Sequence, residues 1–126
     1  MDHFAFTKLV VGDLEACAAF YSRTFGLTEL YRVTDAIGGR RIDEVLFVPT
    51  AEGGGTLALL TFGDPPASAG VIPGFVTDDL DAVFERGVAA GGTVFQAPTD
   101  MPAHGHRVGF LADPEGRVIE IVQALA

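Results

Sequence analysis

The sequence predicts an α+β fold built from two tandem βαβββ modules, each too small to bury a hydrophobic core alone. The first observation is an internal repeat, because Asp13-Leu14 returns 66 positions later as Asp79-Leu80, each time between an apolar run and a helical pattern. The second is that short apolar runs separated by glycine-containing turns follow the helical pattern in both halves. A length of 126 residues suits one domain, so the modules are expected to be halves of one body over 1–126.

The first module is expected over about residues 1–63. A helix is predicted between Asp13, a suitable N-cap, and Gly26, a suitable C-terminal stop, because apolar residues between them recur at helical spacing. Glycine-rich turns separate the apolar runs that follow this helix. The predicted elements, in order, are a strand over 4–11, a helix over 14–25, and strands over 28–34, 43–48 and 56–62.

The second module is expected over about residues 71–126, after a linker rich in Gly, Pro and Ala over about 64–70. Asp78 or Asp79 is a suitable N-cap for its helix. The sequence Asp113-Pro114-Glu115-Gly116 is typical of a hairpin turn, because Pro restricts φ and Gly adopts the left-handed conformation. The predicted elements are a strand over 71–76, a helix ending near 90, a strand over 94–96, a loop over 98–105, and strands over 107–111 and 117–122.

The composition excludes several classes of partner. Asp and Glu number 17 against 8 Lys and Arg, and the resulting net charge of −9 argues against nucleic acid and against an anionic membrane surface. No apolar run approaches the roughly 20 residues that a membrane span needs. A single Cys17 and no visible signal peptide predict a cytoplasmic protein without an intrachain disulfide. Hydrophobic residues make up 48%, an excess that favours an apolar cavity, a homodimer interface, or both.

Several motifs together carry a resemblance to a known family. In the first half they are Val10-Val11-Gly12-Asp13-Leu14-Glu15, Phe20-Tyr21 and Phe25-Gly26-Leu27, and in the second half Asp79-Leu80-Asp81, Gly91-Gly92 and Asp113-Pro114-Glu115-Gly116-Arg117-Val118-Ile119-Glu120. They resemble the vicinal oxygen chelate superfamily, which includes glyoxalase I, bleomycin-resistance proteins, extradiol dioxygenases and methylmalonyl-CoA epimerase. The resemblance implies a curled, eight-stranded, open barrel-like sheet with a central cleft, closed within one chain or between two chains. It does not determine the chemistry.

Metal-dependent members of this superfamily hold a divalent ion with side chains from the first and last strand of each module. The resemblance places these four positions at Phe6, Ala58, Ile72 and Glu120. Only Glu120 can bind a metal, whereas a divalent ion requires three or more protein ligands. No cofactor is therefore expected.

A non-standard divalent metal site is the alternative to a metal-free protein. His104 and His106 could join Glu120, because the spacing His-x-His on a strand places both imidazoles on one face. Both histidines lie near a boundary between loop and strand, and this favours the interpretation that one or both are loop residues that hydrogen-bond to the backbone.

Without a metal, Glu120 is the candidate catalytic residue. A lone carboxylate that faces an apolar cleft favours protonation, which suits a general acid or base that moves a proton beside a carbonyl. In the competing interpretation Glu120 pairs with an arginine such as Arg107 and only shapes the pocket. Strand alternation places Val118 and Val122 on the face of Glu120. The expected ligand-binding residues are Phe6, Ala58, Ile72, Arg107, Val118 and Val122.

Two classes of function remain. A binding protein of the bleomycin-resistance kind needs a cleft, aromatic walls, an acidic surface that attracts cationic drugs and no catalytic metal, and we expect this chain to meet all four requirements. This hypothesis predicts binding or sequestration of a small hydrophobic or cationic molecule. The alternative is a glyoxalase-like lyase, or an isomerase or epimerase, that uses Glu120 with or without the atypical metal site. In both cases the expected partners are a small molecule and a second copy of the chain.

Overall fold

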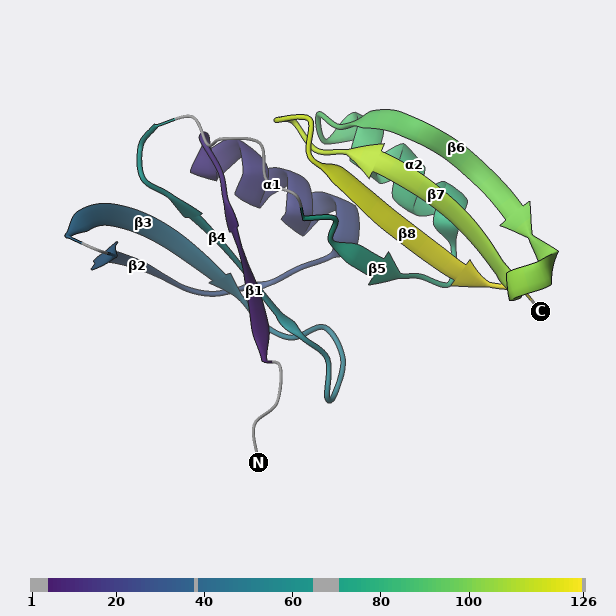
Figure 1. Ribbon diagram of the computed structural model, residues 1–126, viewed down its shortest axis with the longest axis horizontal. Helices are drawn as coiled ribbons and strands as arrows, with labels where there is room; N and C mark the ends of the chain where they lie inside the picture. Colours follow the sequence, from purple (N-terminus) through teal and green to yellow (C-terminus); the bar gives the residue numbers. More distant parts are fainter. Residues whose placement is uncertain (1–4, 38, 65–70, 126) are drawn as a thin grey trace.

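The structure, a computed structural model, describes residues 5–37, 39–64 and 71–125. Both expected βαβββ modules are present (Figure 1). The first contains β1 (Phe6–Val10), α1 (Leu14–Phe25), β2 (Glu29–Ile37), β3 (Arg40–Phe47) and β4 (Thr56–Thr61). The second contains β5 (Gly74–Val76), α2 (Leu80–Ala89), β6 (Thr93–Met101), the short 3₁₀ helix η1 (Pro102–His104), β7 (His106–Ala112) and β8 (Val118–Ala124). The predicted linker over 64–70 lies outside the described residues except for Asp64.

Each module forms its own four-stranded mixed sheet with the same topology. The strand orders are β1-β4-β3-β2 and β5-β8-β7-β6. The first strand of each module pairs in parallel with the last, and the other neighbours are antiparallel. In Figure 1 the edge strands β1 and β5 lie near the middle of the molecule, with β2 and β6 toward its two ends. The predicted α+β architecture is confirmed as a curled open sheet of two modules that is not closed into a barrel.

Both helices begin at the residues that the sequence predicts. The Asp13 side chain accepts a hydrogen bond from the Ala16 N–H, and Gly26 ends α1 with φ at 68°. Asp79 performs the same role for α2 by accepting from the Ala82 N–H. Neither helix of the described chain is long and apolar enough to cross a membrane.

The strand β6 differs from the prediction. We expected a strand over 94–96 and a loop over 98–105, but β6 continues through Pro98 to Met101. A proline lacks the N–H that an inner strand must donate, and β6 is one of the two edge strands of its sheet. Shifts in the register between Val94 and Thr99 accommodate the irregular backbone.

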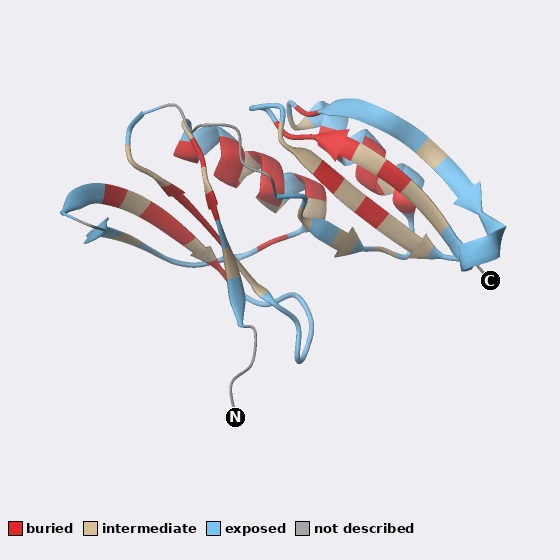
Figure 2. Ribbon diagram, viewed as in Figure 1, coloured by how far each residue is buried: buried red, intermediate tan, exposed pale blue. Residues whose placement is uncertain are grey.

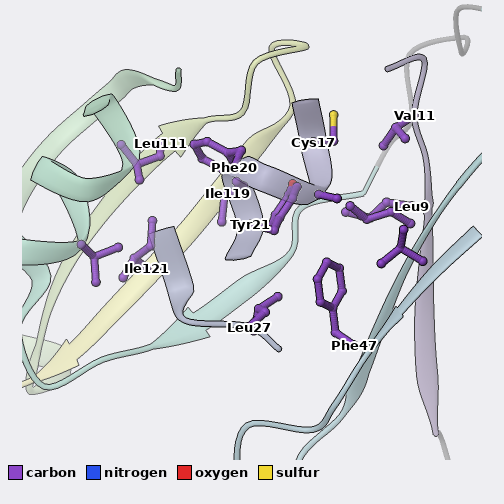
Figure 3. Close-up of a cluster of buried hydrophobic side chains, with 14 of the residues drawn as sticks. Leu9, Val11, Cys17, Phe20, Tyr21, Leu27, Phe47, Leu111, Ile119 and Ile121 are labelled. Atoms are coloured by element: carbon purple, nitrogen blue, oxygen red, sulfur yellow. The ribbon is translucent and has the colours of Figure 1, made fainter. Parts of the chain in front are cut away.

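One hydrophobic core joins the two modules through α1. Figure 3 shows α1, with Phe20 and Tyr21, between side chains of the first sheet and side chains of the second. The rings of Phe25 and Phe75 stack with their centroids 3.8 Å apart, which links α1 to β5. The region between the helices and the two sheets is therefore packed with side chains. The candidate site residues lie mainly on the faces of the two sheets that are turned away from the helices.

Candidate functional site

Each sheet has one face against the helices and one face turned away from them, which we call its open face. Along β8, Ile119 and Ile121 are buried in the core. The intervening Val118, Glu120 and Val122 are half-buried and share the open face of the second sheet. Figure 2 shows the resulting bands of buried and intermediate residues on β7 and β8.

The open face around Glu120 is apolar. Glu120 pairs with Phe110 on β7 and with Gly74 on β5, and the next pairs on this face join Val122 to Val108 and Val76. In the described part of the chain, no basic side chain forms an ion pair with Glu120. This arrangement leaves a half-buried carboxylate without a countercharge among hydrocarbon side chains.

Arg107 does not pair with Glu120, so that competing interpretation is wrong. The guanidinium donates hydrogen bonds to Asp100 at 2.9 Å and to Asp81 of α2 at 3.0 Å. These two carboxylates raise the pKa of Arg107. Strand alternation places Arg107 on the helix side of β7, with the core residue Leu111, and away from the face that carries Glu120.

The two histidines do not assemble with Glu120. His106 pairs with Ala124, four residues along β7 from the partner of Glu120, which corresponds to about 13 Å along the strand. His104 lies in η1 and is exposed. Among the residues that the structure describes, no group of three or more His, Cys, Asp or Glu side chains could hold a metal ion. The alternative site of His104, His106 and Glu120 is therefore not formed.

Ile72 lies beside the second open face. The Glu120 N–H donates to the carbonyl oxygen of Pro73 at 2.9 Å, which places the adjacent Ile72 next to β8. Ile72 is exposed. Val118 and Val122 thus flank Glu120 along β8, and Ile72 lies next to that strand.

Phe6 and Ala58 belong to the first sheet. Phe6 pairs with Thr56, and Ala58 pairs with Lys8, on the neighbouring strands β1 and β4. Alternation with the buried Leu9 and Leu59 places both Phe6 and Ala58 on the open face. Phe6 is exposed, whereas Ala58 is buried.

These residues do not fit the divalent metal of the metal-dependent superfamily members. The side chains of Phe6, Ala58 and Ile72 consist of hydrocarbon only and offer no electron pair to a metal. Glu120 is the one donor among the four positions, and divalent ions in proteins need more ligands than one carboxylate. The open face of the second sheet therefore provides the chemistry of a single acid in apolar surroundings.

Sequence reasoning missed an ion pair on the first open face. Lys8 Nζ lies 2.7 Å from Glu44 Oε2, and both residues alternate with core residues of their strands. The alternation of Lys8 with Leu9 was a usable signal for its face. Its pairing with Glu44 required the register of β1, β4 and β3, which the sequence does not show.

The turn between β7 and β8 holds the two modules together. The Glu115 carboxylate accepts hydrogen bonds from the Gly12 N–H at 2.9 Å and from the Asp13 N–H at 2.6 Å, at the start of α1. Such a position favours a carboxylate, because the free N–H groups and the dipole of a helix N-terminus are positive. The hairpin turn that the sequence predicts thus also contacts the first module.

A buried charge cluster lies behind this turn. Asp113 accepts hydrogen bonds from Arg117 Nη1 at 2.6 Å and from the Tyr21 hydroxyl at 3.0 Å. Arg117 also donates to the carbonyl oxygen of Val10 on β1 at 2.8 Å. Burial and the adjacent Asp113 raise the pKa of Tyr21, so its hydroxyl remains a donor. The cluster satisfies its charges within the protein and is structural.

A groove of about 380 Å³ lies between α1 and the strands β2 and β3. Its charged lining residues have partners within the protein. Glu15 pairs with Arg32, Glu44 pairs with Lys8, and Asp43 accepts a hydrogen bond from Thr34. The open face around Glu120 is therefore the better candidate for ligand binding.

Comparisons with known proteins agree with this architecture. Residues 1–121 match the model of the Glyoxalase/Bleomycin resistance protein/Dioxygenase superfamily. The chain is 30% identical to the protein CFP32 of Mycobacterium tuberculosis and 28% identical to a lactoylglutathione lyase of Arabidopsis thaliana, covering 92% and 90% of this chain. It spans only 42% and 41% of the length of these relatives.

A solved structure shares the fold. A glyoxalase family protein from Bacillus cereus superimposes with a TM-score of 0.79 at 17% identity, and the match covers 100% of this chain and 96% of that protein. At this identity the likeness concerns the fold. The family match over most of the sequence and the shared duplicated topology lead to one conclusion: the chain belongs to the glyoxalase/bleomycin resistance protein/dioxygenase superfamily.

Proposed function

We propose that this protein binds small apolar molecules that carry a positive charge, with Glu120 as the countercharge. The observation that carries this proposal is the half-buried Glu120 carboxylate on an apolar open face, with no basic partner in the described chain. A cationic group of a ligand would provide the missing countercharge, and Val118, Val122 and Ile72 would contact its apolar part.

The charge of the whole chain supports the same class of ligand. A net charge of −9 attracts cations and raises their rate of encounter with the protein. The contribution is long-range and decreases with added salt. The local contact with Glu120 would then determine where a bound cation rests.

We further propose that the protein is a homodimer whose second copy covers the open faces of the sheets. Large apolar side chains are exposed on or beside the sheets, and extended apolar surface on a folded chain is typical of an interaction site. They include Phe6, Tyr31, Ile72, Val76, Val94 and Phe95. Sedimentation of the purified chain would test this proposal, with a dimer expected at micromolar concentration and a monomer as the contradicting result.

Binding of two matched ligands tests the role of Glu120. Naphthylmethylamine and naphthylmethanol have the same ring, but only the amine is charged at neutral pH. Calorimetry should show that the amine binds at least about tenfold more tightly, because a charge-assisted hydrogen bond replaces a neutral one. Glu120→Gln should remove this preference while the alcohol binds as before.

A matched control uses a carboxylate on another surface. Glu85 is exposed on α2, on the helix side of the second sheet. Glu85→Gln removes the same charge and should keep the preference for the amine. An undiminished preference in Glu120→Gln would contradict the proposal.

The likeness to a lactoylglutathione lyase favours one second candidate function. In that case the protein is a lyase, isomerase or epimerase, and Glu120 moves a proton next to a substrate carbonyl. Glu120→Gln would then abolish turnover while substrate still binds. If the wild type shows no measurable turnover and Glu120→Gln loses binding of the cationic ligand, the result would instead support the first proposal, a binding protein.

A further inference from the structure

The open face of the first sheet carries the only lysine of the chain. Lys8 lies on β1 and is 35% exposed, and its Nζ is 2.7 Å from Oε2 of Glu44 on β3. The carboxylate of Glu44 is only 6% exposed. One basic side chain thus faces a nearly buried acid across the intervening strand β4.

The carboxylate of Glu44 lies in apolar surroundings. Glu44 pairs with Leu60 and Val33 on the neighbouring strands, so its lateral neighbours on the open face are apolar. Its Oε2 atom is shielded from solvent and makes no hydrogen bond of good geometry in the described structure. A buried ion pair is weak evidence for stability, because desolvation opposes the attraction of its charges. Lys8 is the basic group that compensates Glu44.

Glu44 and Phe6 fix the position of the Lys8 ammonium. Glu44 attracts it from the side of β3, and the centroid of the Phe6 ring lies 5.7 Å from Nζ. An ammonium has three N–H donors, and contact with one carboxylate oxygen leaves others free. The small Ala58, which pairs with Lys8, adds no bulk beside them. The exposed ring of Phe6 and the positioned ammonium of Lys8 therefore lie together on the open face of the first sheet.

We propose that Lys8 and Phe6 form a binding site for aromatic carboxylates, in which Glu44 is the positioning residue. The ligand carboxylate accepts hydrogen bonds from the exposed side of the Lys8 ammonium, and its ring packs against Phe6, which is 56% exposed. Oε2 of Glu44 is shielded from solvent. It therefore contacts the ammonium from the buried side and leaves the exposed N–H donors to the ligand carboxylate. The site goes beyond the proposed function, since it lies on the other sheet and selects the opposite charge from Glu120.

NMR on the intact protein labelled with ¹³C-lysine tests this site directly. The chain has one lysine, so every labelled signal reports on Lys8. Benzoate should shift the signals of the Lys8 Cε group in a saturable manner. Benzyl alcohol, which has the ring without the charge, and benzylamine, which has the opposite charge, should leave them in place.

Two variants separate this site from general attraction of anions. Lys8→Gln should weaken benzoate binding at least about tenfold in calorimetry, because a charged hydrogen-bond donor is lost. Arg40→Gln removes another basic group of the first sheet, paired with Asp64, and should change the affinity less than about twofold. Lys8 signals that do not respond to benzoate would overturn the proposal, even if Lys8→Gln fails to fold. Equal loss of affinity in the two variants would also overturn it.

Discussion

The helix side and the open faces of the two sheets differ in whether their charged groups have partners within the protein. On the helix side, Asp113 is fully surrounded by donors from Arg117 and Tyr21, and the apolar side chains form one core across both modules. On the open faces, Glu120 has no basic partner in the described chain, whereas Glu44 forms an ion pair with Lys8 at 2.7 Å. Buried polar groups are normally satisfied. The neutral Thr24 hydroxyl of α1 is an exception on the helix side, whereas the half-buried carboxylate without a basic partner, Glu120, lies on an open face.

From this difference we infer that the helix side stabilises the fold and that the open faces bind ligands. The helix side joins the modules through α1 and the turn between β7 and β8. The open face of the second sheet carries Glu120, which no basic side chain of the described residues pairs with. We therefore expect changes on the helix side to reduce the free energy of unfolding, and changes on the open faces to alter ligand binding.

The largest expected effect is the loss of a core ring. Phe20 is fully buried on α1, and its ring lies against Gly92 in the second module. Phe20→Ala should lower the free energy of unfolding by about 3–5 kcal/mol, because it leaves a cavity between the modules. Phe95→Ala, on the exposed face of β6, should cost less than about 1 kcal/mol in the same urea titration. Equal losses would contradict a core shared by both modules.

A smaller effect is expected for the buried charge cluster. Arg117 is 8% exposed and forms an ion pair with the buried Asp113. Arg117→Met should cost about 3 kcal/mol, because it leaves a buried carboxylate without its cation. Arg40→Met breaks an exposed pair with Asp64 and should cost at most about 1 kcal/mol. Chemical denaturation measures both, and an Arg117→Met variant as stable as Arg40→Met would show that the cluster does not join the modules.

The smallest expected effect concerns the reactivity of Cys17. Burial raises the pKa of this thiol to about 12, so the native protein holds it protonated at pH 8. The unfolded chain loses the proton near pH 9, and the native state therefore becomes less stable between pH 9 and pH 12. Iodoacetamide at pH 8 should label Cys17 rapidly in urea and very slowly in buffer, as mass spectrometry would show. Fast labelling of the native protein would contradict this burial.

Local signals predicted most of the fold. Asp13 and Gly26 mark the limits of α1 because capping depends on residues next to the helix. The length of β6 could not be predicted, since a strand that contains Pro98 is acceptable only at a sheet edge, and the edge is a property of the whole sheet.

The candidate site was predicted only in part. The face shared by Glu120, Val118 and Val122 follows from simple alternation along β8. The partners of Arg107 come from α2 and β6, and the partner of Lys8 comes from two strands away. Such contacts depend on sheet register and on helix packing, which no local pattern contains.

An NMR titration of the backbone amides with naphthylmethylamine tests the central claim most directly. Our account predicts that the perturbed amides cluster around Glu120 on β8 and on its neighbours β5 and β7. The amides of the groove between α1, β2 and β3, which include those of Leu14 and Thr34, should remain unchanged. Perturbations confined to the groove, with β8 unaffected, would contradict the assignment of binding to the open face.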